Sequence, residues 1–293
     1  MGQLAQSTNN VVIVGKLKTK EIKYGQSKTS GKVYASGKLV IECENSYGIS
    51  EHTVRLFQFQ LKKDNSENAL YKAIQTIDKE FKTVENNGND ADFVRITGSL
   101  EENSWYNENT QEINTNTQIK GVFVNRLDKE KQMEQGCFLE IEGVIQQIEP
   151  ADDKVKVKLI GIAYGSEAYN VPLVVEGELA TQFQTIYMEG HTATFYCNIL
   201  NVAEEAEVES QEEAVFGIVP KKIIKRVKKD IVITGGKQPK AEGYDIQLIK
   251  EALKQREIKL EALKTQSSTQ DVSPFTQKPS GFENPFANNN SPF

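Results

Sequence analysis

The sequence predicts a mainly β protein, with two small barrels of short strands in tandem, then a helix and a disordered tail. Two stretches, residues 9–128 and 136–236, alternate strand-like runs with turn-rich segments and interrupt them with a helix or a possible helix. Residues 244–264 show a helical period, and residues 265–293 contain almost no aliphatic side chains. Apolar residues make up 38% of the chain, which is enough to build a core in part of it.

The first stretch opens with three predicted strands. The β-branched run VVIV begins the first, and the alternate lysines that follow it fall on one face of an extended chain. After the turn-rich segment GQSKTSGKVYASG, KLVIEC predicts a second strand. Residues 53–59 then alternate, so that Arg55, Phe57 and Phe59 share one face of a third.

A change of period from 2 to 3.6 predicts a helix after these strands. Its apolar stripe consists of Leu70, Ile74, Ile77 and Phe81, and Asp64 with Glu67 resembles a capping box at its start. DFVRITGSL and TQIKGVFVNRL predict two more strands, joined by a polar loop that holds Trp105 and Tyr106. Three strands, a helix and two strands are the order of an OB-fold barrel.

The same residues resemble a known family. NNVVIVGKLKTKEIKYGQSKTSG is similar to the opening of bacterial and phage single-stranded DNA-binding proteins, and VRITGSLEENSWYNENTQEINTNTQIKGVFVN is similar to their last hairpin. The resemblance covers about residues 9–127. It departs from the family before the helix, where Phe57 and Phe59 stand in a stretch that usually holds a tryptophan. It implies a single-stranded DNA-binding protein that acts in DNA replication, recombination or repair, and a cytoplasmic location (host cytoplasm if the protein is viral).

The second stretch, residues 136–236, predicts a second OB-like β-barrel with an acidic loop, 204–213, before its last strand. Residues 177–188 fit either a short helix or a linker. The helix predicted at 244–264 has heptad-like apolar spacing broken by Arg256, which fits either self-association or docking on a barrel.

Charge and composition exclude several classes of function. The net charge is −6, but residues 1–128 carry 16 basic and 16 acidic groups and are balanced. Three unpaired cysteines and two histidines in unrelated contexts predict no disulfide framework, metal site, cofactor or catalytic centre, so we expect no enzyme. No apolar run reaches membrane-spanning length, and no membrane partner is expected.

Binding of a single strand requires aromatic faces that stack on bases and cations that follow the phosphates. The first barrel offers both kinds of side chain, and they are our candidate DNA-binding residues: Lys16, Lys18, Lys20, Lys23, Tyr24, Lys32, Tyr34, Arg55, Phe57, Phe59, Trp105 and Tyr106. Most of these residues have a plainer alternative. Trp105 and Tyr106 could fold onto the barrel, Phe57 and Phe59 could fill its core, and the lysines could be an ordinary solvated face.

Two further segments suggest contacts outside the first barrel. The run at 221–229 is the most basic of the chain, and it predicts either a second DNA contact or a partner for the acidic loop: Lys221, Lys222, Lys225, Arg226, Lys228 and Lys229. Pro-Phe occurs three times in the tail, the last time as Pro292-Phe293. In the family resembled, such a tail recruits replication and recombination proteins.

We therefore expect a homo-oligomer that binds single-stranded DNA. The alternative is an OB-fold interaction module that assembles with protein and does not bind nucleic acid.

Overall fold

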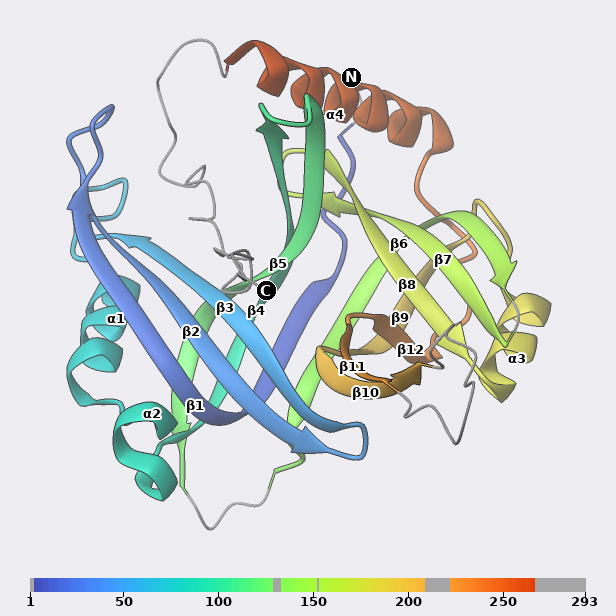
Figure 1. Cartoon of the computed structure of the whole chain (residues 1–293). Helices are drawn as coiled ribbons and strands as arrows, with labels where there is room; N and C mark the ends of the chain where they lie inside the picture. The colour runs from blue at the N-terminus through green and yellow to red at the C-terminus, as the bar shows by residue number, and fades with distance from the viewer. Residues whose placement is uncertain (1–2, 129–132, 152, 209–221, 267–293) are drawn as a thin grey trace, which may run out of the picture.

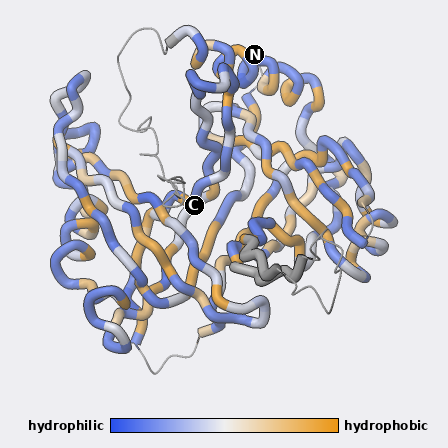
Figure 2. The backbone as a smooth tube through the Cα atoms, in the orientation of Figure 1, coloured by the Kyte–Doolittle hydropathy of each residue, from blue (hydrophilic) through white to orange (hydrophobic). Residues whose placement is uncertain are grey.

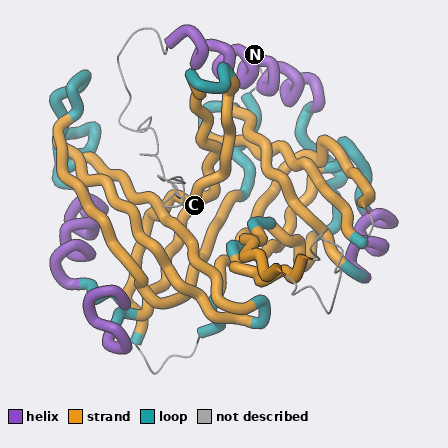
Figure 3. Tube along the Cα trace, viewed as in Figure 1, coloured by secondary structure: helices purple, strands orange, loops and turns teal. Residues whose placement is uncertain are grey.

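The computed structural model describes residues 3–128, 133–151, 153–208 and 222–266, and most of them lie in strands (Figure 3). Five strands and a helix make up a first ring: β1 (Asn9–Gln26), β2 (Val33–Asn45), β3 (Gly48–Phe59), α1 (Ala69–Glu80), β4 (Phe93–Asn107) and β5 (Glu112–Leu127). Strand β1 pairs with β2 and β4, β2 with β3, and β4 with β5. A parallel contact between β3 and β5 closes the ring. This is the strand order of the predicted OB-fold.

A second ring repeats this order in the second half of the chain. Its elements are β6 (Gly136–Ala151), β7 (Lys154–Ala163), β8 (Glu167–Glu176), α3 (Glu178–Ile186), β9 (Thr192–Ile199) and β12 (Ile231–Gly236). Strand β6 pairs with β7 and β9, β7 with β8, and β9 with β12, and a parallel bridge between β8 and β12 closes the ring. The mainly β fold with two OB-like units is therefore confirmed, and residues 178–186 form the helix rather than a linker. The exact domain boundaries stay a prediction.

A hairpin of β10 (Val202–Val208) and β11 (Lys222–Lys228) is inserted before the last strand of the second ring. The acidic segment was predicted as a loop, but residues 204–208 are a strand. The register places Glu204 opposite Arg226 and Glu205 opposite Lys225. Backbone pairing with β11 explains the difference, because a strand partner that lies beyond the acidic segment is not visible in the local sequence pattern.

The two rings are joined through their first strands. Residues 9–14 of β1 pair antiparallel with residues 136–141 of β6, so a continuous sheet runs from one ring into the other (Figure 1). Hydrophobic residues lie along the strands of both rings (Figure 2), and one buried cluster includes side chains from each of them. Ile13 of β1 and Ile141 of β6 are fully buried in this cluster.

Helix α1 is anchored differently from the sequence expectation. Its N-cap is Asn68, whose side chain accepts a hydrogen bond from the Leu70 N–H at 3.0 Å. Asp64 instead accepts from the backbone and hydroxyl of Ser66, so it stabilises the preceding turn. The helix buries Tyr71, Ile74 and Ile77 against the ring, as an amphipathic stripe should.

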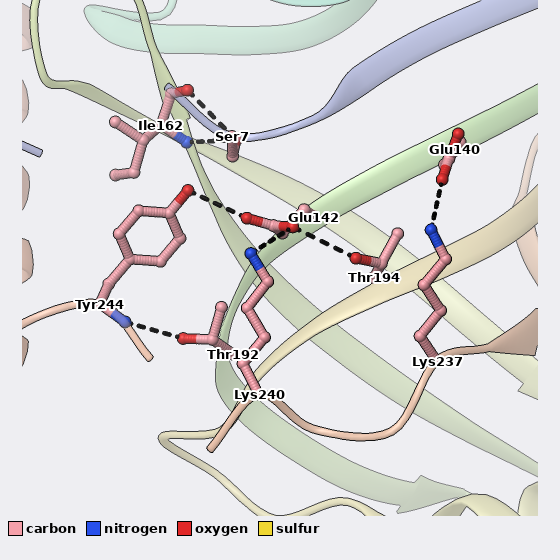
Figure 4. Close-up of polar contacts among 9 residues, drawn as sticks. All are labelled: Ser7, Glu140, Glu142, Ile162, Thr192, Thr194, Lys237, Lys240 and Tyr244. Carbon is pink, nitrogen blue, oxygen red and sulfur yellow. Dashed lines mark hydrogen bonds and ion pairs between the residues drawn. The ribbon is translucent and has the colours of Figure 1, made fainter. Parts of the chain in front are cut away.

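The last described element, α4 (Ile246–Gln266), docks on the second ring. Ile249 and Ala252 are buried against apolar residues of β7 and β8, so the helix docks on a barrel, one of the two alternatives for its apolar spacing. Glu142 of β6, which is only 8% exposed, holds the segment that leads to α4 (Figure 4). The Glu142 carboxylate pairs with Lys240 at 2.8 Å and accepts from the Tyr244 hydroxyl at 3.2 Å. The chain therefore reaches α4 along a defined path.

Candidate nucleic-acid interface

Three aromatic side chains from neighbouring strands gather on the outer face of the first ring. The rings of Tyr34 and Phe57 are 5.3 Å apart, and those of Phe57 and Phe59 are 5.1 Å apart at 84°. Strand alternation explains why Phe57 and Phe59 face outward, because Val54 and Leu56, on the other face of β3, are buried in the core. The plainer reading of Phe57 and Phe59 as core residues is wrong. We call Tyr34, Phe57 and Phe59 the aromatic face.

Cationic side chains border the aromatic face. Arg55 lies on β3 on the same side as Phe57, and the register places it opposite Lys38 of β2. Both are exposed. On the neighbouring strand β1, Lys23 lies opposite Ser36 of β2, and its ammonium forms an ion pair with Glu21 at 2.6 Å. This side of the sheet therefore combines ring faces with cations, the two groups that a single strand requires.

Two predicted site residues lie on the opposite side of the sheet, against α1. The Lys20 ammonium donates to the carbonyls of Ile77, Asp78 and Phe81 at 2.9, 2.5 and 2.8 Å. It thus caps the C-terminal end of the helix, where unpaired carbonyls favour a cation. The Tyr24 hydroxyl donates to Asp78 at 2.9 Å, and burial together with this bond raises the pKa of Tyr24 to about 12. The structure separates both from the aromatic face.

The remaining predicted lysines of β1 and the following turn do not form a continuous ladder. A register shift between Leu17 and Thr19 places Lys18 at a bulge, where it pairs with Glu42 and Glu51. Lys16 and Lys32 are exposed. The even spacing in the sequence predicted one shared face, and the bulge removes it.

Trp105 and Tyr106 lie in strand rather than in the predicted loop. Strands β4 and β5 continue past the ring as a hairpin, in which Trp105 is opposite Asn114 and Tyr106 opposite Ile113. Both aromatic side chains are partly exposed. This ribbon has polar side chains on both faces, so it lacks the apolar alternation by which a strand is recognised. Cross-strand polar contacts support it, among them Ser104 with Thr115 at 2.9 Å.

Sequence reasoning missed Phe123, whose side chain is 55% exposed on β5. Alternation from the buried Ile119 would turn residue 123 inward. A register shift between the pairs Thr97–Phe123 and Gly98–Gly121 inserts Val122 and reverses the alternation. No periodic signal in the sequence marks such a bulge.

The second predicted cluster lies on and beside β11. Lys228 forms an ion pair with Glu176 of β8 at 3.0 Å, and Lys229 is exposed. Lys222, Lys225 and Arg226 lie within the strand. Lys221, Pro292 and Phe293 lie outside the described residues.

The described residues were also compared with what a metal site, a reactive cysteine or a membrane span would require. Among them, no group of three or more histidine, cysteine or acidic residues could hold a metal ion. The three cysteines are free and buried, and burial raises the pKa of Cys43 and Cys197 to about 12. Within the same residues, no helix is both long and apolar enough to cross a membrane.

Comparison with solved structures finds single-stranded DNA-binding proteins at low identity. The wild-type protein from Thermus aquaticus is 12% identical with a TM-score of 0.49, and the match covers 82% of this chain and 97% of that one. The Plasmodium falciparum protein in complex with single-stranded DNA is 16% identical with a TM-score of 0.28, covering 43% of this chain and 100% of that one.

Comparison of sequences gives a more direct assignment. No curated protein matches the sequence significantly. The family model described as YorF matches residues 7–266, which include both rings and α4. The chain therefore belongs to the YorF family.

Proposed function

We propose that the protein binds single-stranded DNA on the outer face of its first ring. The observation that carries the proposal is the aromatic face of Tyr34, Phe57 and Phe59, bordered by Arg55 and Lys38. Stacking on such side chains is worth about 1–3 kcal/mol per base and tolerates any sequence, because every base has a π-face. Since residues 1–128 are electrically balanced, stacking contributes more than long-range attraction.

The finer parts of the proposal extend from this face. Trp105 and Tyr106 would stack further bases from the β4–β5 hairpin, and the basic strand β11 would supply a second contact. We propose a role in DNA replication, recombination or repair, with Pro292 and Phe293 recruiting partner proteins. We also propose a homo-oligomer, which analytical ultracentrifugation would test directly.

A titration with oligo-dT tests the binding. We expect Trp105 fluorescence to be quenched and the anisotropy of a labelled oligonucleotide to rise, with affinity falling as salt is raised. A Phe57→Leu variant should bind more weakly while its circular dichroism is unchanged. Absence of both quenching and gel retardation at low salt would refute the proposal and leave the protein-interaction module as the function.

A further inference from the structure

The second ring carries a row of lysines on the outer face of β7. Lys154, Lys156 and Lys158 alternate with Val155, Val157 and Leu159, and these three apolar side chains are at most 2% exposed. Strand alternation therefore turns all three lysines outward. Lys156 and Lys158 are exposed, and among the described residues none of the three lysines forms an ion pair. We call Lys154, Lys156 and Lys158 the β7 lysine row.

The β7 lysine row lies on the strand of the second ring that corresponds to β2 of the first. Strands β2 and β7 are the second strands of their rings, and each pairs with the first strand across one register shift, at Leu17/Thr19 in β1 and at Ile145/Gln147 in β6. In the first ring, Tyr34, Ser36 and Lys38 of β2 pair with Phe59, Phe57 and Arg55. In the second ring, Lys154, Lys156 and Lys158 of β7 pair with Glu176, Val174 and Pro172. Aligned at the register shifts, Lys154, Lys156 and Lys158 correspond to Ser36, Lys38 and Val40, so this strand carries more lysines in the second ring than in the first.

The acidic residues that face the row have other hydrogen-bond partners. Glu176, opposite Lys154, already pairs with Lys228 of β11 at 3.0 Å. Glu149, opposite Lys156 on β6, accepts a hydrogen bond from Gln147 at 2.7 Å. Successive lysines of the row are separated by two strand residues, about 6.6–6.8 Å along β7. A line of ammonium groups at this spacing suits a chain of regularly repeated anionic groups better than a single small anion.

The β10–β11 hairpin contacts both rings. Val202, at the start of β10, pairs with Ser50 of β3 in the first ring. At the end of β11, Lys228 reaches Glu176 of β8 in the second ring. The hairpin therefore joins the start of β3 in the first ring to the end of β8 in the second.

We propose that the β7 lysine row binds the phosphates of a single strand whose bases stack on the aromatic face of the first ring. The inference rests on the proposed function and assigns a different kind of contact to each ring. The first ring holds bases, and the second ring holds the backbone of the same strand.

A pair of matched double variants tests the inference. In Lys156→Gln/Lys158→Gln, the two exposed lysines of the row lose their charge. The control is Lys250→Gln/Lys254→Gln, which removes the same charge from two exposed lysines of α4. Both act on exposed side chains, so both should fold, and circular dichroism checks this. The ligands are two oligo-dT strands, one of about 10 nucleotides, which matches the site of one OB-fold, and one several times longer.

The salt dependence of binding gives the decisive readout. For single strands the logarithm of affinity falls with the logarithm of salt by about 0.7 per phosphate contact, so loss of two contacts should reduce the slope by about 1.4. This equals about a sevenfold change in the ratio of affinities between 50 and 200 mM salt. We expect the reduced slope only when the row variant binds the long strand. The row variant with the short strand, and the α4 control with either strand, should keep the slope of the unmodified protein.

The outcomes separate the two proposals. If the unmodified protein binds the long strand, and the row variant and the α4 control then show the same slope, the row binds no phosphate and the inference fails while the proposed function stands. If the unmodified protein binds neither strand, the proposed function fails and the inference fails with it.

Discussion

The ion pair between Arg256 of α4 and Glu102 of β4 should hold the β4–β5 hairpin against the helix. The Arg256 guanidinium contacts both carboxylate oxygens of Glu102, at 3.1, 3.3 and 2.9 Å. The two side chains are only 17% and 11% exposed. The Glu102 carboxylate also accepts the backbone N–H of Asn170 on β8, at 3.1 Å. One carboxylate therefore fixes the hairpin of the first ring to both a helix and a strand of the second.

Replacing Arg256 by Met keeps much of the side-chain length and leaves the Glu102 charge without its partner. Removing one member of a nearly buried pair costs about 3 kcal/mol. We expect amides of the hairpin and of the C-terminal half of α4 to exchange hydrogen about 100-fold faster, since this factor corresponds to that free energy.

The neighbouring pair of Lys259 and Glu167 supplies a matched control. It joins the same helix to β8, but its side chains are 63% and 61% exposed, so Lys259→Met should cost less than about 1 kcal/mol. Adding Glu102→Gln to Arg256→Met should restore part of the protection, because Gln removes the unpaired charge and still accepts from Asn170. Equal exchange rates in the Arg256 and Lys259 variants would refute this reasoning.

Three further predictions follow from single side chains. Lys20→Met removes the cation from three carbonyls at the end of α1, so it should lower the free energy of unfolding by about 1–2 kcal/mol in a urea titration, with oligo-dT affinity unchanged. Burial lowers the pKa of His52 to about 4, so on acidification the unfolded chain binds a proton at this histidine before the folded protein does. The free energy of unfolding should therefore fall by up to about 3 kcal/mol as the pH drops from 6.5 to 4. In urea titrations across this pH range, His52→Gln should show a weaker pH dependence. Phe57→Leu should weaken oligo-dT binding about 5- to 150-fold, as expected for one lost stacking contact, whereas Tyr24→Phe, which changes a side chain on the α1 side, should leave it within about twofold; comparable losses in both would contradict the assignment of the binding face.

The periodicity of the sequence correctly predicts the orientation of β3 and the presence of α1. The alternation in residues 53–59 places Phe57 on the outer face because the buried Val54 and Leu56 fix the orientation of β3. The helical stripe of α1 is found for the same reason, since its period distinguishes it from the strands around it.

The remaining features depend on contacts between distant segments. Lys20 reaches carbonyls that are 57 to 61 residues away in the chain, and no spacing within β1 indicates this. The bulges at Lys18 and Val122 reverse the facing of the residues that follow, although the sequence around them continues to alternate. The lysines of β7 are visible in the motif DKVKVKL, but their place opposite β8 appears only when the second ring is closed.

The pairing of β1 with β6 has a kinetic consequence for any ligand that spans both rings. Because the rings belong to one chain and share a hydrogen-bonded ladder, dilution cannot separate them. A strand released by one ring stays within reach of the other, at an effective concentration in the millimolar range typical of short tethers. Rebinding then competes with escape, so residence time should increase with ligand length more steeply than the number of contacts alone would predict.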